Sequence, residues 1–412
     1  MKNLQTEAQR PAGKGSAKLT AFLCWLVYTT AYFGRYSYAS NITPIMDAFG
    51  ISHADAGLVT TCFFFAYGIG QVVNGFLSKY YNRKVIIPLA LCISVAINLA
   101  VFMGIPFAYF KYLWLLNGML QSILWPTIVV TLSANLEQKD LSKAVVIMSS
   151  TVPVGLFVSY SLSSVFSAFG GFRLSFLFAA VTMSIAAVTW FALYNKALRA
   201  QARSAHSTPA QTQRKQMGRA TAVIVVTMCI LAVANNLIKD GLNSWIPAIL
   251  KESFGLPEYL SIVLALVLPV FGVFGSMCNV LIRRKLQSFV VHAGVWYLLT
   301  LICIGIVMAF IGTKHWYVVL GVFGLISLFM HGTNSVITGI APLYMREKTN
   351  SGLLAGVLNG CCYVGSTISS YGLGAIADNF GWGSVFSLLF CVCLGMVVLS
   401  AGIGLWERHN NS

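Results

Sequence analysis

Residues 19–44 read LTAFLCWLVYTTAYFGRYSYASNITP, an apolar stretch that holds a single arginine, Arg35, near its end. A helix that spans a membrane needs about 20 mostly apolar residues, and this stretch supplies them. The whole chain has the same character, because 57% of its 412 residues are hydrophobic and only 9% are charged. Soluble domains carry about 25% charged residues. We therefore expect an all-α integral membrane protein. Residues 19–41 are expected to form its first membrane helix, which is not cleaved from the protein.

Apolar runs of membrane-spanning length recur along the sequence. One long polar segment, 196–219, is basic and rich in Ala, Gln and Ser, and it lies midway. It predicts a cytoplasmic linker between two six-helix halves, 1–195 and 220–412. The twelve transmembrane helices are expected at 19–41, 54–79, 85–106, 109–134, 142–168, 173–195, 220–249, 258–282, 287–312, 315–344, 350–377 and 382–406.

The basic residues follow the topology of these helices. The net charge is +16, which in a soluble chain would suggest a nucleic-acid partner. With both termini in the cytoplasm, 21 of the 27 Lys and Arg residues fall on the cytoplasmic side and 4 on the opposite side. Membrane proteins concentrate Lys and Arg in cytoplasmic loops. Insertion in the membrane therefore explains the charge, and no nucleic-acid partner is expected.

The two halves share a weak internal repeat. Near the end of the first expected helix, Arg35 is followed by Pro44 and then by a Phe-Gly pair. Near the end of the seventh, Lys239 is followed in the same order by Pro247 and a Phe-Gly pair. Related halves are typical of secondary transporters, which bind substrate between their repeats near the middle of the membrane.

Three charged residues are expected deep in the membrane: Arg35, Lys239 and Asp240. A charge at the bilayer centre costs at least about 2.5–3.5 kcal/mol, so such residues usually have a function. The alternatives are a cation that extends to the lipid headgroups and a purely structural ion pair. Arg35 lies some distance from its helix ends, which disfavours the first alternative. Asp240 could neutralise Lys239, but adjacent helical residues point about 100° apart.

Polar and aromatic residues follow the same helix faces as these cations. Their spacing of three or four residues places them in stripes on five helices. One stripe alone would suggest hydrogen bonding between helices, whereas five favour a shared substrate path. His331 and Asp240 are the candidates for ion coupling. The candidate substrate-binding residues are Arg35, Lys239, Tyr28, Tyr32, Tyr67, Gln71, Gln121, Trp125, Asn235, Asn359 and Tyr363.

The chemistry of these residues points to an anion with several acceptor oxygens. Arg offers a planar fork of donors that matches phosphate or carboxylate, and Lys is a common phosphate ligand. The sequence has no Walker, HExxH or suitably placed GxSxG motif, so an enzyme is not expected. Neither a metal nor a cofactor is expected.

Several segments resemble the major facilitator superfamily, and within it the organophosphate:phosphate antiporters that carry glycerol 3-phosphate or hexose phosphates. NGMLQSILWP (117–126) is similar to the family's NGxxQGxGWP signature, and LNGCCYVGS (358–366) and AYGIGQVVNG (66–75) resemble two weaker segments. GFLSKYYNRK (75–84) is a degraded form of the superfamily's loop after its second helix. The resemblance implies that Arg35 and Lys239 hold substrate, with Tyr28 and Tyr32 beside Arg35.

The sequence also departs from that family in ways that concern the substrate. Lys239 replaces an arginine, and Gln71 stands where the glycerol 3-phosphate type has a lysine. Val152 stands at the place of a histidine, and Val130 at the place of an arginine. The cavity is therefore expected to be less basic than in well-known members.

Three functions remain open from the sequence. The first is a monomeric multi-pass transporter of the bacterial inner membrane that exchanges a sugar or polyol phosphate for inorganic phosphate by alternating access. The second is a proton- or sodium-coupled symporter of another organic anion, such as a sugar acid. The third is a transporter-like sensor of phosphate esters.

Overall fold

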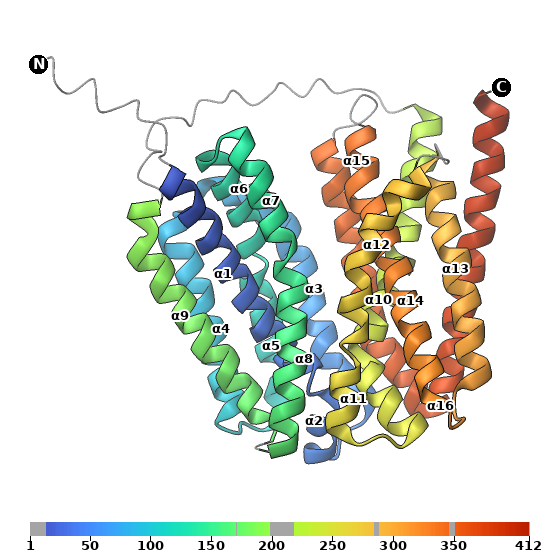
Figure 1. Cartoon of the computed structure of the whole chain (residues 1–412), viewed down its shortest axis with the longest axis horizontal. Coiled ribbons are helices and arrows are strands. Elements are labelled where there is room, and N and C mark those ends of the chain that lie inside the picture. Colours follow the sequence, from blue (N-terminus) through green and yellow to red (C-terminus); the bar gives the residue numbers. More distant parts are fainter. Residues whose placement is uncertain (1–13, 170, 198–217, 284–287, 346–350, 412) are drawn as a thin grey trace, which may run out of the picture.

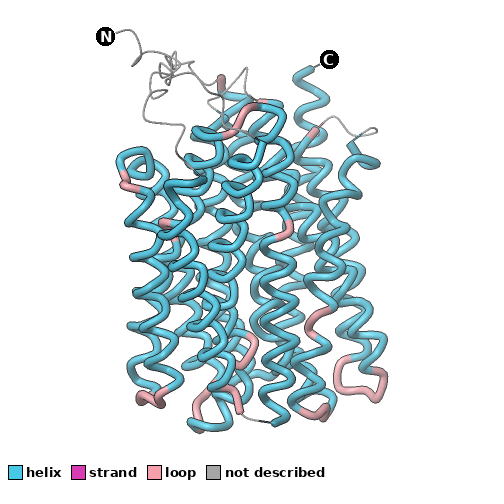
Figure 2. Tube along the Cα trace, turned by 60° about the vertical axis from the view of Figure 1, so that its left-hand side comes forward, coloured by secondary structure: helices cyan, strands magenta, loops and turns pink. Residues whose placement is uncertain are grey.

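The computed structural model describes residues 14–169, 171–197, 218–283, 288–345 and 351–411. Helices make up nearly all of these residues, and short loops join them at the two ends of the molecule (Figure 2). The all-α prediction is confirmed. Most of the predicted linker, 196–219, lies outside the described residues.

The helices of the first half form one bundle (Figure 1). Its elements are α1 (Lys14–Ala39), α2 (Ile42–Phe49), α3 (His53–Leu77), η2 (Ser78–Tyr80), α4 (Arg83–Phe102), η3 (Phe107–Tyr109), α5 (Phe110–Gln121), α6 (Leu124–Asn135), α7 (Gln138–Ser149), α8 (Thr151–Phe169) and α9 (Arg173–Ala197).

The helices of the second half form a second bundle beside the first. Its elements are α10 (Arg219–Phe254), α11 (Glu258–Leu264), α12 (Val267–Arg283), α13 (Phe289–Phe310), α14 (Trp316–Asn334), the π-helix η4 (Ser335–Ile340), α15 (Ala341–Tyr344) and α16 (Ser351–Asn411).

Membrane-spanning helices occur where the sequence predicts them. Ten helical segments in the described residues are long and apolar enough to cross a membrane. One of them runs through α16, whose backbone breaks at Gly381 with a φ of 75° and so forms two helices. α1 is not among the ten but is 26 residues long. With α1 added and α16 divided, the described residues contain the twelve expected helices.

The end of the first expected helix differs from the prediction. α1 ends at Ala39 rather than at residue 41, and a separate short helix, α2, follows it. The Asn41 amide donates to the Ser37 carbonyl at 2.8 Å, and Gly50 ends α2 with a φ of 59°. A polar side chain that bonds to the preceding turn and a left-handed glycine are ordinary ways to end a helix.

The two bundles converge at the end of the molecule opposite the start of α1 and the end of α16 (Figure 1). Because the charge distribution places the termini in the cytoplasm, this is the extracytoplasmic end. Here Tyr160 of α8 donates to the Asn243 carbonyl of α10 at 2.6 Å, and Thr61 of α3 donates to the Thr367 carbonyl of α16 at 2.8 Å. The bundles are therefore hydrogen-bonded to each other at the extracytoplasmic end.

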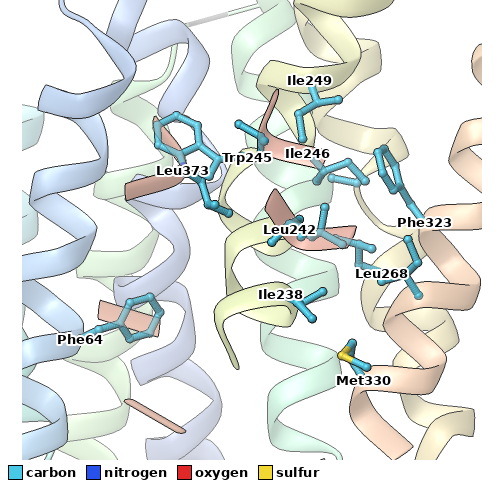
Figure 3. Close-up of a cluster of buried hydrophobic side chains, with 14 of the residues drawn as sticks. Phe64, Ile238, Leu242, Trp245, Ile246, Ile249, Leu268, Phe323, Met330 and Leu373 are labelled. Carbon is cyan, nitrogen blue, oxygen red and sulfur yellow. The ribbon is translucent and has the colours of Figure 1, made fainter. Parts of the chain in front are cut away.

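The apolar core of the second bundle positions α10. Figure 3 shows Ile238, Leu242 and Ile246 of α10 beside Leu268 of α12 and Phe323 of α14. All five side chains are buried. Full burial of one such side chain contributes about 1.5–3 kcal/mol. This packing fixes the rotation of α10 and therefore the direction of its polar residues.

A close backbone approach between the bundles involves Gly57 of α3. A Cβ at Gly57 would lie 2.1 Å from the Ser370 carbonyl oxygen of α16, whereas a Cβ at Gly75 of the same helix would meet nothing within 4 Å. We expect Gly57→Ala to separate the bundles here and to raise the labelling of nearby residues by an impermeant reagent about tenfold. Gly75→Ala is the control and should change nothing. Equal labelling of both variants would contradict the expectation.

Candidate functional site

Arg35 of α1 lies inside a cage of aromatic rings. Its Cζ atom is 4.2 Å from the ring centroid of Tyr67, 4.7 Å from that of Tyr32 and 5.0 Å from that of Phe63. Arg35 is 8% exposed, and no acid forms an ion pair with it in the described part of the chain. Cation–π contacts stabilise a guanidinium that has lost water, but they leave its charge unneutralised.

Gln121 of α5 fixes one side of the Arg35 guanidinium. Arg35 Nε donates to Gln121 Oε1 at 3.4 Å, and Gln121 Nε2 donates to Asn117 Oδ1 at 3.1 Å. Asn117 Oδ1 also accepts from Ser94 Oγ of α4 at 2.9 Å. Two buried amides of α5 and a hydroxyl of α4 therefore orient the arginine of α1.

The tyrosines of the predicted stripes meet beside Arg35. The hydroxyl oxygens of Tyr28 and Tyr67 are 3.5 Å apart, and the Tyr28 ring centroid is 4.9 Å from that of Trp125. The Tyr67 ring centroid is 5.0 Å from that of Tyr363 of α16. This last contact joins the two bundles, so the aromatic cluster belongs to both.

Lys239 of α10 has a carboxylate beside it. Its Nζ atom is 3.4 Å from Asp240 Oδ1, and both side chains are largely buried. Asp240 Oδ2 accepts from Asn236 Nδ2 at 3.0 Å and from Ser366 Oγ of α16. The sequence left this pairing open, and the structure forms it.

A small cavity connects the two charged clusters. Arg35 and Asp240 both line it, although they come from different bundles, and so do the aromatic residues Tyr36 and Phe63. The charged lining residues are one cation from the first bundle and one acid from the second, with the Lys239 ammonium next to that acid. Two of the three deep charges expected from the sequence therefore line one cavity, and the third pairs with one of them.

Other predicted site residues bond mainly within their own bundles. Gln71 Nε2 donates to the Ser122 carbonyl at 3.4 Å. Asn235 Nδ2 donates to Asn236 Oδ1 at 3.1 Å, and His331 Nδ1 donates to the Ser327 carbonyl at 2.9 Å. Asn359 is half-buried on α16, one turn before Tyr363. These residues face other helices of their bundles, and none of them lines the cavity.

The sequence analysis missed several residues of the site. Tyr36 lines the cavity, and its ring stacks on Tyr32 at a centroid distance of 5.9 Å. Asn236 and Phe63 contact the two charged clusters directly. Asn236 lies four residues before Asp240, a spacing that predicts a helical hydrogen bond. Phe63 carries no polar signal that distinguishes it from a core residue.

The family can now be assigned from the sequence profile that the chain matches. Residues 24–370 match the profile of the Major Facilitator Superfamily. The chain belongs to this superfamily. It is therefore a multi-pass membrane transporter rather than an enzyme, and the predicted fold is confirmed.

Similar proteins of known description include a sugar-phosphate carrier and a sensor. The chain is 21% identical over 417 residues to a probable hexose phosphate transport protein of Chlamydia pneumoniae. The alignment covers 93% of this chain and 90% of the relative. It is 30% identical over 97 residues to the membrane sensor protein UhpC of Escherichia coli. That alignment covers 24% of this chain and 22% of the relative.

Solved superfamily structures share the fold of this chain. One of them is a bacterial homolog of the human lysosomal transporter Spinster in an inward-facing and occupied conformation. It aligns with a TM-score of 0.76 at 14% identity, and the alignment covers 96% of this chain and 98% of the homolog. The nucleoside transporter NupG aligns with a TM-score of 0.73 at 10% identity, with coverages of 94% and 99%.

Proposed function

We propose that the protein exchanges an organic phosphate ester, such as a sugar or polyol phosphate, for inorganic phosphate by alternating access. The observation that carries the proposal is Arg35, a buried cation that has no acid partner in the described residues and lines a cavity shared by both bundles. The guanidinium of Arg35 offers the forked donors that suit a phosphate group. The hexose phosphate transport protein among its relatives supports the same substrate class.

Lys239 supplies the second cation in this proposal. Its ammonium lies 3.4 Å from Asp240, whose carboxylate lines the cavity. An anion that engages Arg35 from one bundle and Lys239 from the other would favour the conformation in which the bundles approach. A ligand can shift a conformational equilibrium only through such a difference in affinity. The tyrosines and Gln121 would contact the hydroxylated remainder of the ester.

Phosphate exchange is tested by counterflow in liposomes. We expect uptake of labelled hexose 6-phosphate or glycerol 3-phosphate to require phosphate inside the vesicles and to survive collapse of the proton gradient. Empty vesicles and vesicles loaded with sulfate are the controls. Uptake that ignores internal phosphate and stops when the proton gradient collapses would refute exchange.

A proton-coupled symporter of an organic anion is the second candidate. The specific observation in its favour is that Asp240, a carboxylate in the middle of a membrane helix, lines the cavity. Ionisable acids in the membrane often carry protons in coupled transporters. His331, the other coupling candidate, is half-buried on α14 and bonds to the helix backbone.

The variant Asp240→Asn separates the two candidates. The amide keeps the shape of the carboxylate and cannot take part in a proton cycle. Asp240→Asn leaves the buried Lys239 unpaired and should lower the stability of the protein. If the protein exchanges phosphate, we expect phosphate-driven uptake per folded molecule to remain within about fivefold of wild type, since Arg35 and Lys239 persist. His331→Gln should behave likewise. Loss of accumulation in Asp240→Asn, with unimpaired binding, would favour symport.

A further inference from the structure

A histidine joins the two bundles at the extracytoplasmic end, away from the cavity. His53 begins α3, and its ring lies between carboxylates from two helices of the second bundle. Its Nδ1 atom is 2.6 Å from Asp378 Oδ1 of α16. Its Nε2 atom is 2.8 Å from Glu252 Oε1 of α10 and 3.0 Å from Glu252 Oε2.

The geometry fixes the number of protons on the His53 ring. An ionised carboxylate only accepts hydrogen bonds, so each ring nitrogen that faces one must donate. A neutral imidazole has a single N–H, and only the imidazolium has two. With Glu252 and Asp378 ionised, the observed contacts therefore require a positively charged His53.

Both carboxylates are held in place by further donors. Asp378 accepts from the backbone N–H groups of His53 at 2.9 Å and Ala54 at 2.7 Å, where α3 begins. Glu252 Oε2 accepts from Trp382 Nε1 at 2.8 Å. The acceptors are therefore positioned before the histidine is protonated. A neutral ring donates to one carboxylate at a time, and the added proton supplies the second N–H, so that the ring bonds to both.

The charged groups around His53 single it out as the one that titrates near neutral pH. Glu252 from α10 and Asp378 from α16 face it, and Lys251 lies beside Glu252. The Asp55 carboxylate of α3 accepts from Ser52 Oγ. Lys251 pairs with Asp47 and, at 3.6 Å, with Glu258. Ordinary Asp, Glu and Lys side chains hold their charge between pH 5 and 8, whereas an imidazole changes its charge there.

We propose that His53 is a proton-binding site that controls opening of the extracytoplasmic end. The protonated ring holds α3 against α10 and α16, and release of the proton to the extracytoplasmic solution permits the bundles to separate. Once separated, His53 faces no carboxylate and titrates as an exposed imidazole, near pH 6.5. The closed form therefore binds the proton more tightly than the open form.

The direction of the pH effect follows from this difference. Closure is fully stabilised below about pH 6.5, where the ring is protonated in both forms. The stabilisation is lost as the pH rises and the closed form gives up its proton. Alkaline solution outside the cell therefore favours the outward-open form, and acid solution favours the closed form.

Hydrogen exchange of the full-length protein in lipid nanodiscs tests the proposal without any substrate. The measured quantity is the opening of peptides that cover 51–62 and 368–382, corrected for the chemical pH dependence of exchange. We expect opening in the wild type to rise about tenfold between pH 6 and pH 8.5. In His53→Gln, opening should be high and should change less than twofold.

Two further variants sharpen the test. His315→Gln removes an exposed histidine that contacts Tyr317 Oη at 2.9 Å, and it should retain the wild-type pH response. His53→Lys keeps a positive charge throughout this pH range and should stay closed and insensitive to pH. A wild type that is insensitive to pH would overturn the proposal, and so would an unchanged pH response in His53→Gln. Because no substrate is present, neither result bears on phosphate exchange.

Discussion

Arg35→Lys is expected to lower the kcat/KM of phosphate-ester uptake about 100-fold, a loss of about 2.7 kcal/mol of transition-state stabilisation. Lysine keeps the charge but loses the forked donors, the Nε–H that bonds to Gln121 and the flat surface that lies against Tyr32 and Tyr67. Counterflow with labelled ester into phosphate-loaded vesicles measures the effect.

The control for Arg35→Lys is the same substitution at an exposed position. Arg173 begins α9 at the extracytoplasmic end and is exposed, so Arg173→Lys should transport as wild type does. Equal protein yield and thermal stability of the two variants would exclude a folding defect. Wild-type uptake by Arg35→Lys would show that the anion does not depend on the guanidinium.

Lys239→Gln is expected to abolish uptake and also to destabilise the protein, because it leaves the buried carboxylate of Asp240 unpaired. Removing one partner of a buried ion pair costs about 3–5 kcal/mol. The double variant Lys239→Gln, Asp240→Asn removes both charges and should recover most of the thermal stability. It should not recover uptake, since the second cation of the site is still missing.

The double variant also decides between the two interpretations of Lys239. If the pair were purely structural, restoring stability would restore uptake as well. Measuring melting temperature and counterflow on the same preparations separates the two results. Asp240→Asn alone is the control for the loss of the carboxylate.

Helix positions and the polar faces of helices were predictable from the sequence, because both follow from short-range periodicity. The apolar runs located the membrane helices, and the spacing of Tyr28, Tyr32 and Arg35 placed them on one face, where the structure brings their rings and charge together. The break after Ala39 was not predicted. It depends on local hydrogen bonds of Asn41 within a segment that remains apolar.

Contacts between distant segments were not predictable in the same way. The pairing of Lys239 with Asp240 depends on side-chain rotamers that the packing of α10 selects. The sequence analysis did not single out His53, because its partners Glu252 and Asp378 lie 199 and 325 residues further along the chain. Such residues become recognisable only when the two bundles are placed side by side.

The two deep cations, Arg35 and Lys239, have different neighbours, and this difference matters when no substrate is bound. Asp240 offsets the charge of Lys239, whereas Arg35 is surrounded by aromatic rings and by neutral amides. Arg35 therefore carries a positive charge that no acid offsets in the described residues, in a region of low dielectric. In the proposed exchange, the bound anion would remove this electrostatic penalty, so that the protein would bind its substrate most strongly where its own charge is least balanced.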